Sequence, residues 1–205
     1  MMKEIDHCYI MRFYELYEGE NHIYCLVELL MGGSLMERVK KAKRFPETQA
    51  LIICKQIIDA LEYLEAKAII HRDIKPENII FKSKFFGSGI ALVDLGFATR
   101  KSEYDKLFSR CGTPGFVAPE VFMGKQYDCN ADIFSAGIIF YIMLIGCMPF
   151  RGTYNEVIAQ NLACKLDFDF SKQSLTFKPS SNRCLISHRS PQVYVAKGRL
   201  QTTIC

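Results

Sequence analysis

The sequence predicts an α+β fold, with strands concentrated near its beginning and helices dominating the rest. Two observations support this. Residues 10–17 and 22–29 are rich in apolar and β-forming residues, and the turn-like sequence EGEN at 18–21 joins them, as in a β-hairpin. Beyond residue 45, longer segments carry apolar residues at helical spacing.

The first helices are predicted from their starting residues and their periodicity. Ser34 follows two glycines and can cap a short helix that runs to about Lys41. A longer helix is expected from about Pro46, because proline suits a first helical turn. Its apolar residues recur at intervals of four, four and three, on one helical face: Ile53, Ile57, Leu61 and Leu64.

The second half of the chain alternates between short strands, a loop and helices. Residues 79–81 and 90–93 are predicted strands on either side of a Gly-Ser-Gly turn. Residues 94–120 lack periodicity and contain glycine, threonine and proline, which indicates a long ordered loop. Helices are predicted at about 131–146 and 153–164.

The net charge of +4 comes from the end of the chain. Residues 171–205 hold six basic residues and no acidic one, whereas residues 1–170 hold 20 basic and 22 acidic residues. The charge is therefore no argument for a nucleic-acid-binding domain, and we expect no nucleic-acid partner. This basic, Ser/Thr-rich tail shows no helical stripe, so we expect it to be poorly ordered.

The nine cysteines are scattered without a C-x-x-C pair, which is typical of reduced thiols and predicts a cytoplasmic or nuclear protein. One stretch, 133–150, is uncharged over 18 residues, at the lower limit for a membrane span. It contains two glycines and a proline, and Asp132 stands directly before it. We therefore predict a buried helix and no membrane span.

The most informative segment is 71–78, with the sequence HRDIKPEN. It places a carboxylate at Asp73, a cation at Lys75 and an amide at Asn78. Phosphoryl transfer needs a carboxylate to orient the attacking hydroxyl, a cation on the phosphate and an oxygen ligand for a metal ion. Any one of these residues alone would more often belong to an ordinary polar turn between a helix and a strand.

Three further segments follow in order. Asp94 stands at the end of a predicted strand, two residues before a glycine, where a carboxylate suits Mg²⁺. Residues 111–120 read CGTPGFVAPE, and residues 132–137 read DIFSAG. Each segment is weak evidence alone, but chance does not explain their order and spacing.

Together the four segments resemble the signature set of the eukaryotic serine/threonine protein kinases. Lys75 and the sequence GTPG at 112–115 favour the serine/threonine branch over the tyrosine branch. The sequence ELLMGG at 28–33 and residues 111–120 are closest to the calcium/calmodulin-dependent kinase group. The resemblance implies a protein-kinase-like fold over residues 1–170. Residues 1–30 would form two strands and the hinge of the small lobe, and residues 31–170 the helical large lobe.

The resemblance also implies roles for individual residues. Asp73 is expected to be the catalytic base and Lys75 to contact the γ-phosphate, while Asn78 and Asp94 would hold Mg²⁺. ATP would contact the backbone of Glu28 and Leu30, with Val27 as the gatekeeper. Ile80 would form the floor of the nucleotide pocket.

Regulatory and structural roles are implied in the same way. Arg72 would contact a phosphate added to Ser109 by an activating kinase. Thr113 is expected to hydrogen-bond to Asp73 and Lys75, and Glu77 to attract an arginine of the protein substrate. Two acidic residues are expected to have structural roles. Asp132 would brace the backbone of segment 71–78. Glu120 would pair with an arginine, for which Arg183 is a weak candidate.

The sequence contains no G-x-G-x-x-G loop and no matching lysine ahead of the hairpin, and these normally cover the nucleotide phosphates. We therefore expect the chain alone to be weak or inactive. Three interpretations stay open: an incomplete version of an ordinary kinase, a non-catalytic pseudokinase that acts as a binding module, and a gene fragment without function. The presence of Asp73, Lys75, Asn78 and Asp94 together favours the first.

Overall fold

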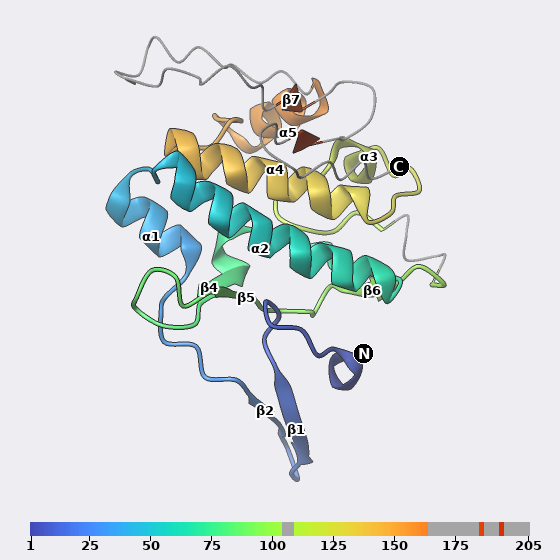
Figure 1. Ribbon diagram of the computed structural model, residues 1–205. Helices are drawn as coiled ribbons and strands as arrows, with labels where there is room; N and C mark the ends of the chain where they lie inside the picture. Colours follow the sequence, from blue (N-terminus) through green and yellow to red (C-terminus); the bar gives the residue numbers. More distant parts are fainter. Residues whose placement is uncertain (104–108, 164–184, 187–192, 195–205) are drawn as a thin grey trace.

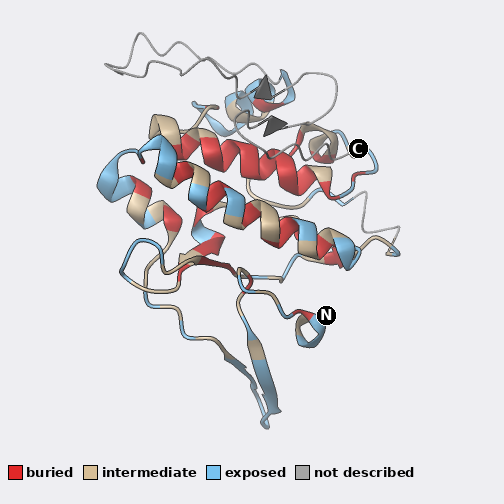
Figure 2. Ribbon diagram, viewed as in Figure 1, coloured by how far each residue is buried: buried red, intermediate tan, exposed pale blue. Residues whose placement is uncertain are grey.

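Two long helices form the centre of the protein, and a β-hairpin projects from them (Figure 1). The computed structural model describes residues 1–103, 109–163, 185–186 and 193–194. Helices α2, Glu47–Ala66, and α4, Asn130–Ile145, pack side by side. Most of the buried residues lie on or around these two helices, as Figure 2 shows in red. This arrangement confirms the predicted α+β class.

The hairpin consists of β1, Phe13–Glu18, and β2, Ile23–Val27, which pair antiparallel with Glu18 opposite Ile23. It confirms the predicted strands, although β1 begins three residues later than residue 10. A short 3-10 helix, η1, Met2–Glu4, precedes it. Most hairpin residues are exposed on both faces, whereas Ile5 and Ile10 just before it are buried in the core. The first ten residues therefore attach the hairpin to the helical body.

Helix α1, Leu35–Ala42, begins as predicted at Ser34. The Ser34 side chain accepts a hydrogen bond from the backbone N–H of Glu37, and the Glu37 carboxylate accepts one from the backbone N–H of Ser34. This reciprocal capping satisfies two N–H groups that the helix leaves unpaired. Pro46 directly precedes α2, and the predicted apolar face of α2 is buried: Ile53, Ile57, Leu61 and Leu64.

Helix α4 is buried on almost every side, as predicted for residues 133–150. It ends at Gly146, whose φ of +81° is a left-handed conformation that favours glycine. A Cβ atom at this position would stand 2.0 Å from the carbonyl oxygen of Lys43, so no other residue fits without a backbone shift. None of the helices in the described parts of the chain is both long and apolar enough to span a bilayer.

Four short strands bracket the segments that carry the motifs. Strand β3, Ile69–Ile70, pairs with β6, Thr99–Arg100, and β4, Ile79–Phe81, pairs with β5, Ile90–Leu92. A 3-10 helix, η2, Pro76–Asn78, leads directly into β4. Segment 71–78 thus runs from one small sheet to the other, and both of its ends are held by strand pairing.

The predicted loop 94–120 contains two elements that the sequence did not indicate. They are β6 and helix α3, Pro119–Phe122. Strand β6 is only two residues long and depends on its partner β3, some thirty residues earlier, so it leaves no local periodicity. Residues 104–108 of this segment lie outside the described residues.

Helix α5, Tyr154–Ala163, confirms the last predicted helix. Two short strands, β7, Leu185–Ile186, and β8, Val193–Tyr194, pair antiparallel. The rest of the tail, and the domain boundary predicted near residue 170, lie outside the described residues. The predicted boundary and the predicted disorder of the tail therefore stay predictions.

Candidate active site

Asp73 lies at the centre of a buried polar cluster. Asp73 is 3% exposed, and its carboxylate accepts a hydrogen bond from the Lys75 ammonium at 2.6 Å. The Thr113 hydroxyl donates to the other carboxylate oxygen at 2.7 Å, and Lys75 also donates to Thr113 at 3.1 Å. Such an arrangement fixes the direction of the carboxylate while keeping its charge paired. The predicted contacts of Thr113 with Asp73 and Lys75 are thus present.

Asn78 completes the cluster from the end of η2. Its amide nitrogen donates to the backbone oxygen of Asp73 at 2.9 Å and to the Asp73 carboxylate at 3.2 Å. Because the amide nitrogen faces Asp73, the amide oxygen points to the other side and is available as an acceptor. Asn78 therefore both closes the turn of segment 71–78 and presents an oxygen ligand.

Asp94 reaches the same region from the neighbouring strand. The backbone N–H of Val93 donates to the carbonyl oxygen of Asn78 at 2.9 Å, so the β4–β5 ladder brings Asn78 and Asp94 to the same end. Asp94 is exposed, and its carboxylate accepts a hydrogen bond from the backbone N–H of Gly96 at 3.1 Å. An amide oxygen and an exposed carboxylate are hard oxygen ligands, so these two residues fit Mg²⁺.

The backbone of segment 71–78 is braced from α4. Asp132 is 3% exposed, and its two carboxylate oxygens accept hydrogen bonds from the backbone N–H groups of His71 at 2.7 Å and Arg72 at 2.9 Å. Arg72 has a φ of +70°, a strained value for a residue with a side chain. Burial raises the pKa of Asp132, while the two backbone N–H donors and the positive charge of Arg72 act in the opposite direction. The bracing role predicted for Asp132 agrees with this geometry.

His71 is fully buried beneath the loop. Burial lowers its pKa, which keeps the imidazole neutral. Its Nδ1 atom accepts a hydrogen bond from the backbone N–H of Asp73 at 3.3 Å, and its Nε2 atom lies 3.2 Å from the carbonyl oxygen of Val93. A neutral ring protonated on Nε2 satisfies both contacts. His71 thereby joins segment 71–78 to the strand that leads to Asp94.

The predicted nucleotide-binding residues are half-buried where the hairpin meets the helical body. Val27 ends β2, and Ile80 lies in the middle of β4. The Glu28 carboxylate accepts a hydrogen bond from Lys82 at 3.0 Å and from the backbone N–H of Arg12 at 3.3 Å. The backbone N–H and C=O of Leu30 make no hydrogen bond within the described part of the chain.

Arg72 connects segment 71–78 to the segment before Thr113. Its guanidinium donates to the carbonyl oxygen of Phe97 at 2.6 Å, to the Ser109 hydroxyl at 2.9 Å and to the Tyr127 hydroxyl at 3.3 Å. The Tyr127 hydroxyl also donates to the backbone oxygen of Ser109 at 3.1 Å. Ser109 is exposed and already touches the cation expected to receive its phosphate.

Glu120 is half-buried at the start of α3. Burial raises its pKa above the ordinary value of 4.5, and the negative charge of Asp128 adds to this effect. Within the described residues no cation lies at ion-pair distance from its carboxylate. Arg183, the partner suggested by the sequence, lies outside these residues. Glu77, the predicted contact for a substrate arginine, is exposed beside the cluster.

The geometry agrees with the sequence comparisons. The family described as protein kinase domain matches residues 1–189. The chain belongs to the protein kinase family. Its fold is accordingly the α+β kinase fold, and the enzyme class of the family is that of the transferases.

Similar kinases come from several organisms. Calcium-dependent protein kinase 5 of Plasmodium berghei (strain Anka) is 40% identical over 96% of this chain, which covers 36% of that relative. A probable myosin light chain kinase of Dictyostelium discoideum is 36% identical over 79% of this chain and 52% of its own length. Calcium/calmodulin-dependent protein kinase type 1 of Macrobrachium nipponense is 34% identical over 82% of the chain and 49% of its own length. The kinase chain thus spans about a third to a half of these relatives.

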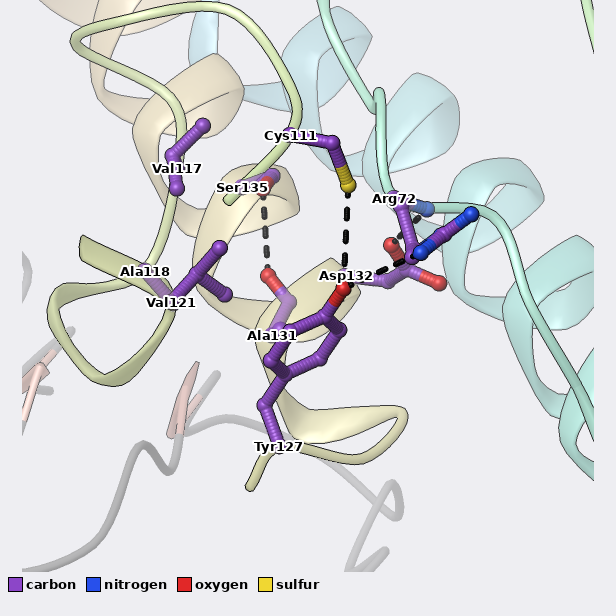
Figure 3. Close-up of a pocket in the computed structure, with 9 residues that line it drawn as sticks. All are labelled: Arg72, Cys111, Val117, Ala118, Val121, Tyr127, Ala131, Asp132 and Ser135. Atoms are coloured by element: carbon purple, nitrogen blue, oxygen red, sulfur yellow. Dashed lines mark hydrogen bonds between the residues drawn. The ribbon is translucent and has the colours of Figure 1, made fainter. Parts of the chain in front are cut away.

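Sequence reasoning missed Tyr127, which contacts Arg72, Ser109 and Cys111 in this kinase. Figure 3 shows its ring below Cys111, with its hydroxyl 3.6 Å from the Cys111 sulfur. Tyr127, Arg72 and Cys111 line a small cavity under the segment before α3. Tyr127 stands alone between Gln126 and Asp128, so no motif in the sequence marks it. Only the tertiary contact identifies it as part of the site.

Glu120→Gln should alter the pH dependence of stability. A raised pKa in the folded state means that folding favours the protonated carboxyl. The contribution of the Glu120 carboxyl to stability is fully present below its unfolded-state pKa near 4.5. It is lost as the pH rises through the folded-state pKa. The variant should therefore gain stability relative to wild type between acidic and neutral pH, measured by urea unfolding at each pH. A variant that instead loses stability toward neutral pH would reveal a cationic partner.

Proposed function

We propose that this chain is the catalytic part of a serine/threonine protein kinase that transfers the γ-phosphoryl group of ATP to protein hydroxyl groups. The observation that carries this proposal is the cluster of Asp73, Lys75, Thr113 and Asn78. Burying a carboxylate and orienting it with an ammonium, a hydroxyl and an amide costs free energy. A turn with a purely structural role has no need of such a group. A substrate hydroxyl would have to come within hydrogen-bond distance of one of the two carboxylate oxygens of Asp73.

Each residue of the cluster has a separate task. Asp73 orients the substrate hydroxyl and accepts its proton as the oxygen attacks the γ-phosphorus. Lys75, which is held between Asp73 and Thr113, places its positive charge on the transferred phosphoryl group. Asn78 and Asp94 would hold Mg²⁺, which neutralises charge on the phosphates when bound.

ATP would bind where the hairpin joins the helical body. The backbone groups of Glu28 and Leu30 would meet the adenine edge, because those of Leu30 have no partner among the described residues. Val27 would border the rear of the pocket and Ile80 its floor. The small Val27 side chain leaves more room than a larger residue would.

We infer that the chain needs further elements for full activity. In the family, a glycine-rich loop and a lysine lie ahead of the strand that corresponds to β1 and cover the phosphates. No residues of this sequence match them. The isolated chain should therefore turn over slowly, and a longer polypeptide that carries these elements should be active.

Phosphorylation of Ser109 would activate the site. A phosphate there adds up to about two negative charges next to the Arg72 guanidinium, whose nitrogen already lies 2.9 Å from the Ser109 oxygen. Since Arg72 also binds Phe97, the phosphate would tie the segment after Asp94 to the catalytic loop. Partners would then be protein substrates and an activating kinase, in the cytoplasm or nucleus. Glu77 would favour substrates with a nearby arginine.

The proposal is tested with the natural full-length polypeptide and three peptides that differ only in a serine, threonine or tyrosine acceptor. We expect label from γ-labelled ATP on the serine and threonine peptides when Mg²⁺ is present. A chelator should abolish the transfer, and the tyrosine peptide should remain nearly unlabelled. If tyrosine were labelled as well as serine, or if no peptide were labelled, the proposed function would be wrong.

A further inference from the structure

Two successive carbonyl groups of the segment after Thr113 are held by buried side chains from two different helices. The Ser135 hydroxyl on α4 donates to the carbonyl oxygen of Phe116 at 2.8 Å. The Asn161 amide on α5 donates to the carbonyl oxygen of Val117 at 2.9 Å. Ser135 is 6% exposed and Asn161 is fully buried. Figure 3 shows Ser135 on α4 next to Val117, and both residues line the same small cavity.

Among the described residues, hydrogen bonds satisfy only half of the Asn161 amide. Its oxygen makes no hydrogen bond within the part of the chain that the structure describes, although it is buried. Burying an amide oxygen without a partner is unfavourable, so packing alone would favour an apolar residue of similar size, such as leucine. Among the described residues, the hydrogen bond to Val117 is therefore the feature that distinguishes asparagine from leucine at this position.

The held segment lies directly beside the proposed reaction centre. Thr113 contacts both Asp73 and Lys75, and Phe116 follows it by only three residues. Successive Cα atoms are about 3.8 Å apart, so the Cα atoms of residues 115–117 lie at most about 15 Å from that of Thr113, a distance that a few residues of a peptide substrate can span. Gly115 has a φ of +90°, and a Cβ there would stand 2.8 Å from the Met148 side chain, so this wall sits close against the body of the protein.

We propose that Asn161, together with Ser135, sets substrate specificity by holding the wall formed by residues 115–117. Asn161 cannot touch substrate because it is fully buried, so it acts as a positioning residue through the Val117 carbonyl. Two bonds on adjacent carbonyls fix both the position and the tilt of the wall. The wall then selects the substrate residues on either side of the acceptor. This inference rests on the proposed kinase function.

The test uses three variants. Asn161→Leu keeps the side-chain size and removes the donor, and Ser135→Ala removes the second bond. Asn155→Leu makes the same chemical change at an exposed position of α5 and serves as the control. Hydrogen exchange of the amides in residues 115–118 is measured on this chain. On the full-length polypeptide, kcat/KM is measured for pairs of peptides with the same acceptor serine. The two peptides of a pair have leucine or serine at one position next to the acceptor, and the ratio of their kcat/KM values is compared between variants.

We expect Asn161→Leu to speed hydrogen exchange in residues 115–118 about fivefold. The ratio of kcat/KM between the peptides should fall by about the same factor, because both changes reflect one lost hydrogen bond. The reduction should appear mainly in KM, and Asn155→Leu should match wild type. Unchanged exchange or unchanged peptide ratios in Asn161→Leu would overturn the inference while leaving the kinase function intact. If the wild-type polypeptide labels no peptide, the kinase function fails, and the exchange rates alone then decide whether Asn161 holds the wall.

Discussion

Asp73→Asn should reduce phosphoryl transfer about 10²–10⁴-fold, because the amide cannot accept the proton of the substrate hydroxyl. Asparagine has nearly the same shape as aspartate. Its amide oxygen can keep the hydrogen bonds from Lys75 and Asn78, and its NH2 group can donate to the Thr113 hydroxyl, which donates to Asp73 in the wild type. The expected nucleotide contacts lie elsewhere, at Glu28 and Leu30, so the affinity for ATP should change little. The measurement is kcat for a serine peptide together with the dissociation constant of ATP, both on the full-length polypeptide.

The matched control is Asp128→Asn, which makes the same chemical change at an exposed position. The Asp128 carboxylate accepts a hydrogen bond from the backbone N–H of Asn130, and an asparagine oxygen can accept it too. Activity should therefore stay at the wild-type level. Near-wild-type turnover in Asp73→Asn would refute the assignment of Asp73 as the base. A parallel loss of ATP binding would indicate a collapsed site instead of a missing proton acceptor.

Asp132→Ala should destabilise the protein by about 3–5 kcal/mol, the largest stability effect that we expect for a single substitution. The change leaves the backbone N–H groups of His71 and Arg72 without their acceptor in a buried environment. It also releases the strained backbone of Arg72, which the carboxylate holds at a φ of +70°. The free energy of unfolding, measured by urea denaturation of this chain, gives the effect directly.

Asp6→Ala is the control for this substitution, because Asp6 is exposed and its nearest cation, on Arg12, is 3.9 Å away. Exposed substitutions of this kind change stability by no more than about 0.5 kcal/mol. A loss in Asp132→Ala as small as that of the control would show that α4 does not brace the catalytic loop.

The sequence predicts this protein best where its residues act through local patterns. The cap at Ser34 and the buried face of α2 depend on neighbouring positions along the chain, and the structure has both. Asp73, Lys75 and Asn78 lie within six residues, so their grouping in space follows from one tight loop. The predicted contacts of Thr113 came from the resemblance, and the structure contains them.

The features that sequence reasoning missed depend on distant partners. Strand β6 exists only because β3 pairs with it. Tyr127 is 55 residues from Arg72 in the chain, and Asn161 is 44 residues from Val117. Such residues carry no periodic or motif signal, because their importance comes from the group they meet after folding. The roles assigned to Val27, Glu28, Leu30, Ile80 and Glu77 stay predictions for the same reason, since their expected partners are substrates.

The most direct test of the account is single-turnover transfer of labelled γ-phosphoryl from Mg²⁺-ATP to a serine peptide, with the wild-type full-length polypeptide and Asp73→Asn compared side by side. The account predicts rapid labelling of the serine by the wild type and a rate lower by about 10²–10⁴-fold in the variant that still binds ATP. Equal rates in the two proteins, or no labelling by the wild type, would contradict it.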